Sequence, residues 1–471
     1  MNAPLSPHVV RKPLADEFID GLRTIFGERL SFADAVREHH GRDESPYPPM
    51  PPDAVVFAHT TEEVAALVRL CSQHRVPLIP YGVGTSLEGH LLALQGGVSV
   101  DLSQMNKVLA INPEDLTVTV QAGVTRKQLN QEIRDTGFFF PIDPGADATI
   151  GGMSATGASG TNAVRYGTMR ENVVALTVVT GEAKVIRTAR RAKKSSAGYD
   201  LTRLFVGSEG TLGVITEVTV RIYPQPEAVS AASCSFPTVE AAVRTTIATI
   251  QMGIPVARCE LLDALTVKAV NARDKLGLPE MPLLLFEFHG SASSVAEQAT
   301  MVEEIAREHD AAAFEWATRQ EDRTRLWEAR HNAYFACLQL KPGCRSFTTD
   351  VCVPISRLAE CITATVRDTE QSYLPAPILG HVGDGNFHCA ILADTTKPEE
   401  LAEAERLNHL IVQRALAMDG TCTGEHGVGM HKMDFLREEH GDDALELMAR
   451  IKRSFDPLDI LNPGKVVRIQ N

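Results

Sequence analysis

Three glycine-rich segments constrain the fold of this chain more than any other feature. They are Pro80–Gly89, Pro144–Asn162 and Gly207–Gly213. Glycines let successive backbone N–H groups point to one side and form an anion-binding nest, and the interspersed Ser and Thr hydroxyls add donors. Each segment alone is also typical of a tight surface turn. Three of them in one α/β region favour a bound pyrophosphate, and hence a dinucleotide. None has the G-x-G-x-x-G or G-x-x-x-x-G-K-[ST] pattern, which disfavours a Rossmann domain and a P-loop NTPase.

Strand and helix patterns alternate around these segments. Residues 54–59 predict a strand, 61–74 an amphipathic helix capped by Thr60 or Thr61, and 76–80 a second strand, an order typical of α/β proteins. Residues 15–40 predict a helical segment near the N-terminus. Further strands are predicted at 98–102, 116–120, 173–180, 183–188 and 212–223, and a helix at 125–136.

Two proline-rich stretches predict the domain boundaries. Residues 47–53 form a stiff hinge, and Pro224-Gln-Pro226 ends the α/β region. Beyond it the pattern becomes α+β, with strands predicted at 231–236 and 283–289 and helices at 238–252, 294–309 and 442–455. The prediction is an N-terminal helical segment at 1–46, a nucleotide-binding domain at 47–226, a substrate domain at 227–420 and a C-terminal segment at 421–471.

Composition excludes several classes of protein. A net charge of −14 argues against a nucleic-acid partner, which needs a basic surface. No run of eighteen apolar residues exists, so no membrane span is expected, and the N-terminus lacks the apolar stretch of a secretory signal. A cytoplasmic location follows, with a peripheral position at the inner face of a membrane as an alternative. The nine cysteines include no C-x-x-C pair, which argues against an iron–sulfur cluster and favours reduced thiols.

A second cluster of motifs indicates the chemistry. Gly380–His388 has the sequence GHVGDGNFH, and Thr423–Gly429 has the sequence TGEHGVG. Gly383 and Gly385 disfavour a helix between the two histidines, so a loop leading into a strand at 387–392 is predicted. His381, His388 and Glu425 make an N2O set that suits Zn²⁺ or Mn²⁺ with open positions for substrate. The alternative is that each histidine is only a hydrogen-bonded polar residue.

Together these motifs resemble one flavoprotein family. The chain is similar, from about residue 50 to 466, to FAD proteins of the vanillyl-alcohol oxidase/p-cresol methylhydroxylase (PCMH) type, and most to the branch of D-lactate dehydrogenase (cytochrome) and the glycolate oxidase FAD subunit. The resemblance is carried by both histidine motifs and by segments Tyr81–His90, Asp143–Ala146, Ala158–Gly167, Gly207–Ile215 and Asn462–Lys465.

The resemblance implies an α+β fold: a two-subdomain PCMH-type FAD-binding domain, a ferredoxin-like cap, and a C-terminal arm that returns to the FAD domain. His90 lies outside the sequence context in which relatives attach flavin covalently, so non-covalent FAD is expected. The implied FAD-binding residues are Tyr81, Gly82, Val83, Gly84, Thr85, Ser86, Pro144, Gly145, Ala146, Thr149, Gly152, Gly157, Ser159, Gly160, Thr161, Asn162, Gly210, Gly213, Ile215 and Asn462.

The resemblance also implies a reaction. A D-2-hydroxy acid, D-lactate first, would be oxidised to the 2-oxo acid, with the C2 hydride passing to flavin N5 and the hydroxyl proton to His426. The divalent metal on His381, His388 and Glu425 would polarise the hydroxyl. Arg330, in a W-x-x-R motif, would clamp the carboxylate. Thr348 and Ala390 replace a lysine and an asparagine of relatives that act on diacids, which disfavours 2-hydroxyglutarate. Asp350 would support the site.

Other readings stay open on sequence alone. A glycolate oxidase subunit would need partner chains. A flavin-binding protein without turnover and a metal-dependent hydrolase are further alternatives, the latter disfavoured by the glycine segments. The electron acceptor would be a quinone, a cytochrome or an electron-transfer flavoprotein rather than NAD, because no second nucleotide motif is present. The sequence leaves a homodimer open.

Overall fold

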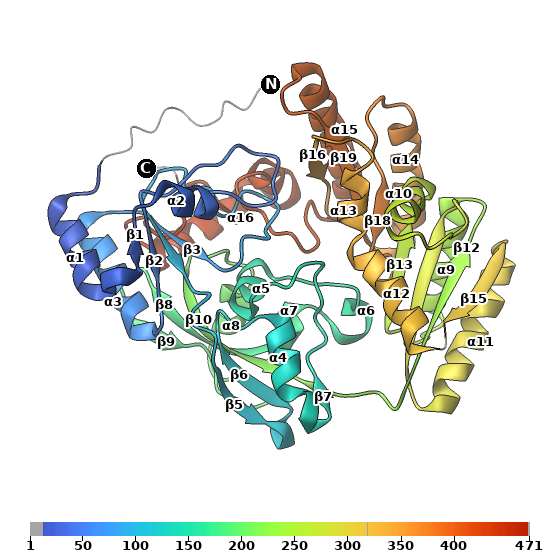
Figure 1. Ribbon diagram of the computed structural model, residues 1–471, viewed down its shortest axis with the longest axis horizontal. Helices are drawn as coiled ribbons and strands as arrows, with labels where there is room; N and C mark the ends of the chain where they lie inside the picture. The colour runs from blue at the N-terminus through green and yellow to red at the C-terminus, as the bar shows by residue number, and fades with distance from the viewer. Residues whose placement is uncertain (1–12, 318, 470–471) are drawn as a thin grey trace.

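The computed structural model describes residues 13–317 and 319–469, which form two lobes (Figure 1). The first lobe begins with a four-stranded sheet ordered β1-β2-β4-β3, in which β2, β4 and β3 are parallel. Buried apolar side chains of α1 and α3 pack with this sheet. The elements of this part are α1 (Asp16–Phe26), β1 (Leu30–Ser31), α2 (Asp34–His40), β2 (Ala54–Phe57), α3 (Thr61–His74), β3 (Leu78–Tyr81) and β4 (Val98–Asp101).

A five-stranded antiparallel sheet, ordered β5-β6-β10-β8-β9, completes the first lobe. Its strands alternate Val and Ile with polar residues, and their inward faces share one apolar core with α4 and α5. The elements are β5 (Val108–Asn112), β6 (Thr117–Gln121), α4 (Arg126–Ile133), β7 (Phe138–Phe139), α5 (Ile150–Thr156), α6 (Ala163–Tyr166), α7 (Met169–Asn172), β8 (Val173–Thr180), β9 (Val185–Arg187), α8 (Leu201–Phe205), β10 (Gly213–Arg221) and β11 (Tyr223–Pro224).

The second lobe is built on an eight-stranded sheet. Its first half runs β12-α9-β13-α10-β14-α11-β15, and the strand order β15-β12-β14-β13 is the ferredoxin-like arrangement expected for the cap. The elements of this half are β12 (Ala228–Ser235), α9 (Val239–Gln251), β13 (Arg258–Leu262), α10 (Ala264–Asp274), β14 (Leu283–Gly290), α11 (Ala292–Glu308), β15 (Ala313–Ala317), α12 (Gln320–His331) and α13 (Ala333–Leu338).

The second half of this sheet joins the first through β18, which pairs with β13. It carries both predicted histidines, His381 just after β18 and His388 within β19. The elements are β16 (Arg345–Thr348), β17 (Val351–Cys352), α14 (Leu358–Glu370), β18 (Ile378–Gly380), β19 (Asn386–Ala393) and α15 (Pro398–Leu416).

The C-terminal arm returns to the first lobe, as expected (Figure 1). Helix α16 (Met433–Phe455) packs its last turns on the five-stranded sheet, and the chain then runs beside β3, where Leu461 bridges Leu78. Gly441 has φ 79° and breaks α16, so the regular helix after it matches the predicted 442–455.

Several element predictions need correction. Residues 15–40 are not one helix, because Gly27 at φ 55° ends α1 and the short strand β1 follows before α2. The strand predicted at 212–223 is divided into β10 and β11. Residues 1–12 of the predicted N-terminal segment lie outside the described residues. All nine cysteines are unpaired, and no helix among the described residues is long and apolar enough to cross a membrane.

Candidate active site

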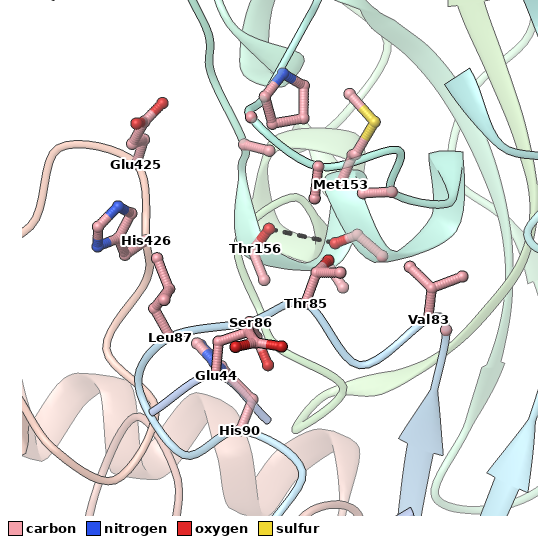
Figure 2. A pocket seen from close by; sticks show the side chains of 18 of the residues that line it. Glu44, Val83, Thr85, Ser86, Leu87, His90, Met153, Thr156, Glu425 and His426 are labelled. Atoms are coloured by element: carbon pink, nitrogen blue, oxygen red, sulfur yellow. Dashed lines mark hydrogen bonds between the residues drawn. The ribbon is translucent and has the colours of Figure 1, made fainter. Parts of the chain in front are cut away.

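A cavity of about 340 Å³ lies where the two lobes and the C-terminal segment meet. The three glycine-rich segments line one end, and His381, His388, Glu425 and His426 line the other. Figure 2 shows the loop of Val83–Leu87 between the segment that carries Glu425 and His426 and the helix that carries Met153 and Thr156. The volume of the cavity is typical of cofactor and substrate sites.

The glycine end of the cavity fits a phosphate-bearing cofactor. Among the described residues, the backbone amides of Val83, Gly84 and Thr85 donate to no other protein group, so their N–H groups are available to an anion. The backbone can approach a ligand closely here because Gly82 and Gly84 have no side chain. A Cβ on Gly82 would lie 2.6 Å from Thr149 Oγ1, and one on Gly84, at φ 79°, 2.6 Å from the Tyr81 hydroxyl.

Most residues predicted to bind FAD line this cavity. They are Tyr81, Gly82, Val83, Gly84, Thr85, Ser86, Pro144, Gly145, Ala146, Thr149, Gly152, Ser159, Thr161, Gly210, Gly213, Ile215 and Asn462. Gly157, Gly160 and Asn162 do not line it. Gly157 ends α5 at φ 68°. A Cβ on Gly160 would lie 2.5 Å from the Asp143 carbonyl carbon, and the Asn162 amide donates to the Pro141 carbonyl oxygen. These three residues shape the loop.

Two histidines converge on one carboxylate at the other end. The Nε2 atoms of His381 and His388 lie 3.1 and 3.3 Å from Oε1 of Glu425. Sheet pairing places both rings. In the register of β18 and β19, His388 lies opposite Leu379, and Leu379 is two residues before His381. A segment from the C-terminal part of the chain brings Glu425 to them.

The second nitrogen of each ring fixes which atom faces the carboxylate. His388 Nδ1 lies 3.2 Å from the Thr349 carbonyl oxygen, which can only accept, so Nδ1 carries the proton. His381 Nδ1 donates in the same way to the Glu260 carboxylate at 2.7 Å. In their neutral forms both Nε2 atoms therefore point a lone pair at the Glu425 oxygen. Three converging lone-pair atoms, with outer partners that hold each ring, suit a divalent cation.

Asp350 lies close enough to count as a further candidate ligand. Ligating atoms of Asp350, His388, Glu425 and His426 all lie within 4.8 Å of one another. However, the Asp350 carboxylate already accepts from the backbone amides of Glu425 and His426 at 2.9 and 2.7 Å, from Thr423 and from Asn386. Because its lone pairs are used, Asp350 holds the 423–426 segment in place, and the set of His381, His388 and Glu425 fits a cation better.

Glu260 joins the histidine cluster to Arg330. Its carboxylate is 1% exposed and contacts His381 on one oxygen and an Arg330 terminal nitrogen, at 2.5 Å, on the other. Arg330 is buried on α12 and lines the cavity. The charge of Arg330 is thus partly balanced by Glu260 before any ligand binds. The sequence did not suggest this partner.

His426 stacks on His388, with ring centroids 4.9 Å apart and planes 4° from parallel. Its Nδ1 faces Glu88 at 3.4 Å and Asp350 at 4.0 Å. Lys432 Nζ lies 2.8 Å from the same Glu88 oxygen. With Nδ1 turned to these carboxylates, Nε2 of His426 is left for a ligand.

The electrostatics separate the roles of these groups. Burial lowers the pKa of His388, and the neighbouring His426 adds to this, which favours the neutral form that binds metals. Burial also opposes ionisation of Glu425, but His381 and His388 outweigh it and hold the pKa of that carboxyl well below its usual range. Burial lowers the pKa of His426, whereas Asp350 and Glu88 raise it, with a net increase.

Sequence reasoning missed several residues at the site. Glu88, Glu209 and Glu260 are buried carboxylates to which the sequence assigned no role. Their partners are distant in the chain: His431 is 343 residues from Glu88, Gly429 is 220 from Glu209 and His381 is 121 from Glu260. His331 and Tyr334 line the cavity on α12 and α13, just after the W-x-x-R motif that ends at Arg330. His90 lines it too and lies 3.0 Å from Glu209. The sequence drew attention to His90 only through the question of covalent flavin attachment, and only their place in the glycine-rich motifs could have drawn attention to Glu88 and Glu209.

Comparison with known proteins identifies the family. Residues 225–466, more than half of the chain, match the family described as FAD linked oxidases, C-terminal domain, and residues 52–189 match the FAD binding domain family. The chain belongs to the FAD-linked oxidases. FAD is therefore the nucleotide that the glycine-rich end of the cavity fits.

Similar proteins cover nearly the whole chain. A protein of Danio rerio, called probable D-lactate dehydrogenase, mitochondrial, is 50% identical over 96% of this chain and 92% of its own length. The mitochondrial D-lactate dehydrogenase [cytochrome] of Arabidopsis thaliana is 46% identical over 97% and 81%. A glycolate oxidase subunit of Bacillus subtilis is 35% identical over 93% and 94%.

Solved structures confirm the fold. A 4-ethylphenol oxidase from Gulosibacter chungangensis superposes with a TM-score of 0.79 at 19% identity, over 97% of this chain and 98% of that one. A p-cresol methylhydroxylase gives 0.76 at 17%, over 97% and 98%. The predicted PCMH-type architecture is confirmed.

Proposed function

We propose that this protein is an FAD- and divalent-metal-dependent dehydrogenase that oxidises D-lactate to pyruvate. The observation that carries the proposal is the convergence of both Nε2 atoms on Glu425 at one end of a cavity whose other end is a glycine-rich nest. Relatives named D-lactate dehydrogenase, at 38–50% identity, support the substrate.

The bound FAD would supply the two-electron acceptor for the C2 hydrogen, and a Zn²⁺ or Mn²⁺ ion on His381, His388 and Glu425 would supply Lewis acidity toward the 2-hydroxyl. His426 takes the hydroxyl proton at Nε2, while Glu88 and Asp350 face its Nδ1 and stabilise the resulting imidazolium. Loss of that proton and of a hydride converts the 2-hydroxy acid to the 2-oxo acid. The electrons then pass to a non-NAD acceptor, a cytochrome, a quinone or an electron-transfer flavoprotein.

Arg330 binds the substrate carboxylate from the cap side, and Glu260 holds its guanidinium in place. Thr348 and Ala390, the two positions that disfavour a diacid, lie opposite each other in the pairing of β16 and β19 and both line the cavity. Neither adds a cation for a second carboxylate. The wall therefore suits a short monoacid.

Anaerobic bleaching of the flavin by D- and L-2-hydroxy acids tests the proposal. D-lactate should bleach it and L-lactate should not. A chelator should abolish the reaction, and added Zn²⁺ or Mn²⁺ should restore it. His426→Ala should lower the bleaching rate by 10²–10⁴-fold, as expected for loss of a general base. His440→Ala, at a half-exposed histidine outside the cavity, should have no effect.

Other results would contradict specific parts. Faster bleaching by glycolate would favour the glycolate oxidase reading, to which the Bacillus subtilis relative also points. Unchanged bleaching after chelation would refute the metal role. Tight flavin with no response to any acid would indicate a binding protein. Non-covalent attachment is tested by acid precipitation, which should leave a colourless pellet and a yellow supernatant.

A further inference from the structure

A second cavity, of about 230 Å³, lies at the seam between the two lobes. The first lobe contributes α4 and the stretch from Phe139 to Pro141, and the second contributes Arg258 on β13 and His289 on β14. It is separate from the proposed active site, and no Asp or Glu is among the described residues that line it. Its lining is Arg126, Asn130, Phe139, Phe140, Pro141, Asn162, Gln225, Arg258 and His289.

Arg126 is the unbalanced charge of this cavity. Its Nε is buried and has no hydrogen-bond partner, and within the described chain Arg126 forms no ion pair within 4 Å. The backbone amide of Arg126 donates to the Ala148 carbonyl oxygen and fixes its position at the start of α4. A guanidinium stays charged at every physiological pH. The Arg126 side chain is partly exposed, but its Nε donor is enclosed without an acceptor, and an unsatisfied buried donor is costly. An anion in the cavity would balance the charge.

The opposite wall is rigid. Arg258 Nε bonds to Asn162 Oδ1 at 3.1 Å, a terminal nitrogen lies 3.2 Å from Asp143, and the guanidinium lies over the Trp327 ring at 4.5 Å. His289 is held between Glu287 and the Tyr166 hydroxyl, both at 2.8 Å. These groups are positioned before any ligand arrives, which lowers the entropic cost of binding.

The other walls set the size and character of a ligand. Phe139 and Phe140 give the cavity an apolar side, and Asn130 is engaged with the Phe140 backbone at 2.8 and 3.0 Å, so it does not compete for a ligand. The volume exceeds that of several waters, at about 30 Å³ each. A cation facing aromatic carbon in this volume suits an anion that also carries carbon.

We propose that this cavity is a binding site for a small organic carboxylate, with Arg126 as its main ligand-binding residue. Bound there, the ligand bridges α4 of the first lobe and β13–β14 of the second. The site also contacts the cofactor cavity indirectly, because Asp143 lines that cavity and pairs with Arg258. The proposal does not depend on the substrate of the active site.

Calorimetric titration of the FAD-loaded protein tests it, with succinate and, separately, inorganic phosphate as probes. Succinate has no 2-hydroxyl and cannot be oxidised at C2. Arg126→Gln should raise the Kd for succinate by at least tenfold, which is the loss expected for one charge-assisted contact. Arg134→Gln is the matched control, because that arginine is exposed and follows the same helix, and it should leave the Kd unchanged. An equal Kd in wild type and Arg126→Gln would overturn the proposal.

Three further results keep the test decisive. If Arg126→Gln loses FAD or fails to fold, Arg126→Lys keeps the charge but removes the buried Nε, and its Kd for succinate should rise severalfold; no change would refute the site. Binding of phosphate without binding of succinate would overturn the assignment to an organic carboxylate. Succinate should also raise the melting temperature of the wild type, and not that of the Arg126 variant.

Discussion

Glu260→Gln is the perturbation that tests the site most directly. Glu260 touches no ligand in the proposed mechanism, yet it holds both His381, at 2.7 Å, and Arg330, at 2.5 Å. Glutamine keeps the size of the side chain and one acceptor oxygen but loses the charge. Arg330 is then a buried cation without a charged partner. The Nδ1–H group of His381 loses its carboxylate acceptor and can hydrogen-bond only to a neutral amide oxygen, which fixes its tautomer less strongly.

Two magnitudes follow from these contacts. Removing one partner of a buried ion pair typically destabilises a protein by about 3–5 kcal/mol. Removing the outer partner of a metal-bound histidine typically weakens metal affinity by about 10–100-fold. We therefore expect Glu260→Gln to lower the free energy of unfolding by about 3 kcal/mol and to weaken Zn²⁺ binding at least tenfold.

Glu287→Gln separates the two effects. Glu287 is a buried carboxylate on the neighbouring strand, paired with Arg258 and His289 and remote from the metal ligands in its contacts. Denaturant unfolding should show comparable losses of stability for both variants, whereas competition with a chelating dye should show weaker Zn²⁺ binding for Glu260→Gln alone. If both variants bind Zn²⁺ within twofold of the wild type, Glu260 does not position His381 for a metal.

Three further predictions concern the cavity wall and two residues outside the cavity lining. Burial lowers the pKa of Lys465 to about 7. Between pH 7 and about 10 the unfolded chain therefore binds more protons than the folded one, and the free energy of unfolding rises with pH. Lys465→Met should flatten that slope relative to wild type in denaturant titrations. Thr348→Lys adds a cation to the wall and should raise kcat/KM for D-2-hydroxyglutarate relative to D-lactate by about 10–100-fold; an unchanged ratio would contradict the reading of that wall. Gly429→Ala, at φ 52°, would place a Cβ 2.1 Å from the Glu88 carbonyl oxygen, and a loss of at least about 2 kcal/mol is expected by thermal unfolding.

The sequence singled out the candidate ligands of the site but not the residues that support them. His381, His388 and Glu425 stood out because glycines surround them, and such residues in flexible backbone are costly without a function. Glu260 lies in the strand sequence RCELL, where a single acid among apolar residues gives no sign of its partners. Its role depends on β13 pairing with β18, a contact between residues over a hundred positions apart.

The same limit explains the fold predictions. Local patterns identified α3 because its apolar residues recur at helical spacing and Thr60 caps it, and β8 because its sequence VVALTVVT is rich in β-branched residues. Helix α12 was not predicted, because its sequence QEDRTRLWEARH has few apolar residues and is stabilised by packing of Leu326 and Trp327 in the second lobe. Glu260, the partner of Arg330, was missed because the two residues are brought together by tertiary packing and not by any local pattern.

Three buried carboxylates that are not proposed to contact the substrate hold the reactive segment in place. Asp350 accepts the amides of Glu425 and His426, and Glu209 accepts those of Val428 and Gly429 at 2.6 and 2.8 Å. Glu88 pairs with Lys432 beyond them. Asp350 comes from the second lobe and the other two from glycine-rich segments of the first, so the segment from 425 to 432 can adopt this conformation only when both lobes are in position. A weakened contact at Glu88 or Glu209 should therefore impair metal binding, although neither residue is a proposed metal ligand, because both carboxylates hold the segment that carries Glu425.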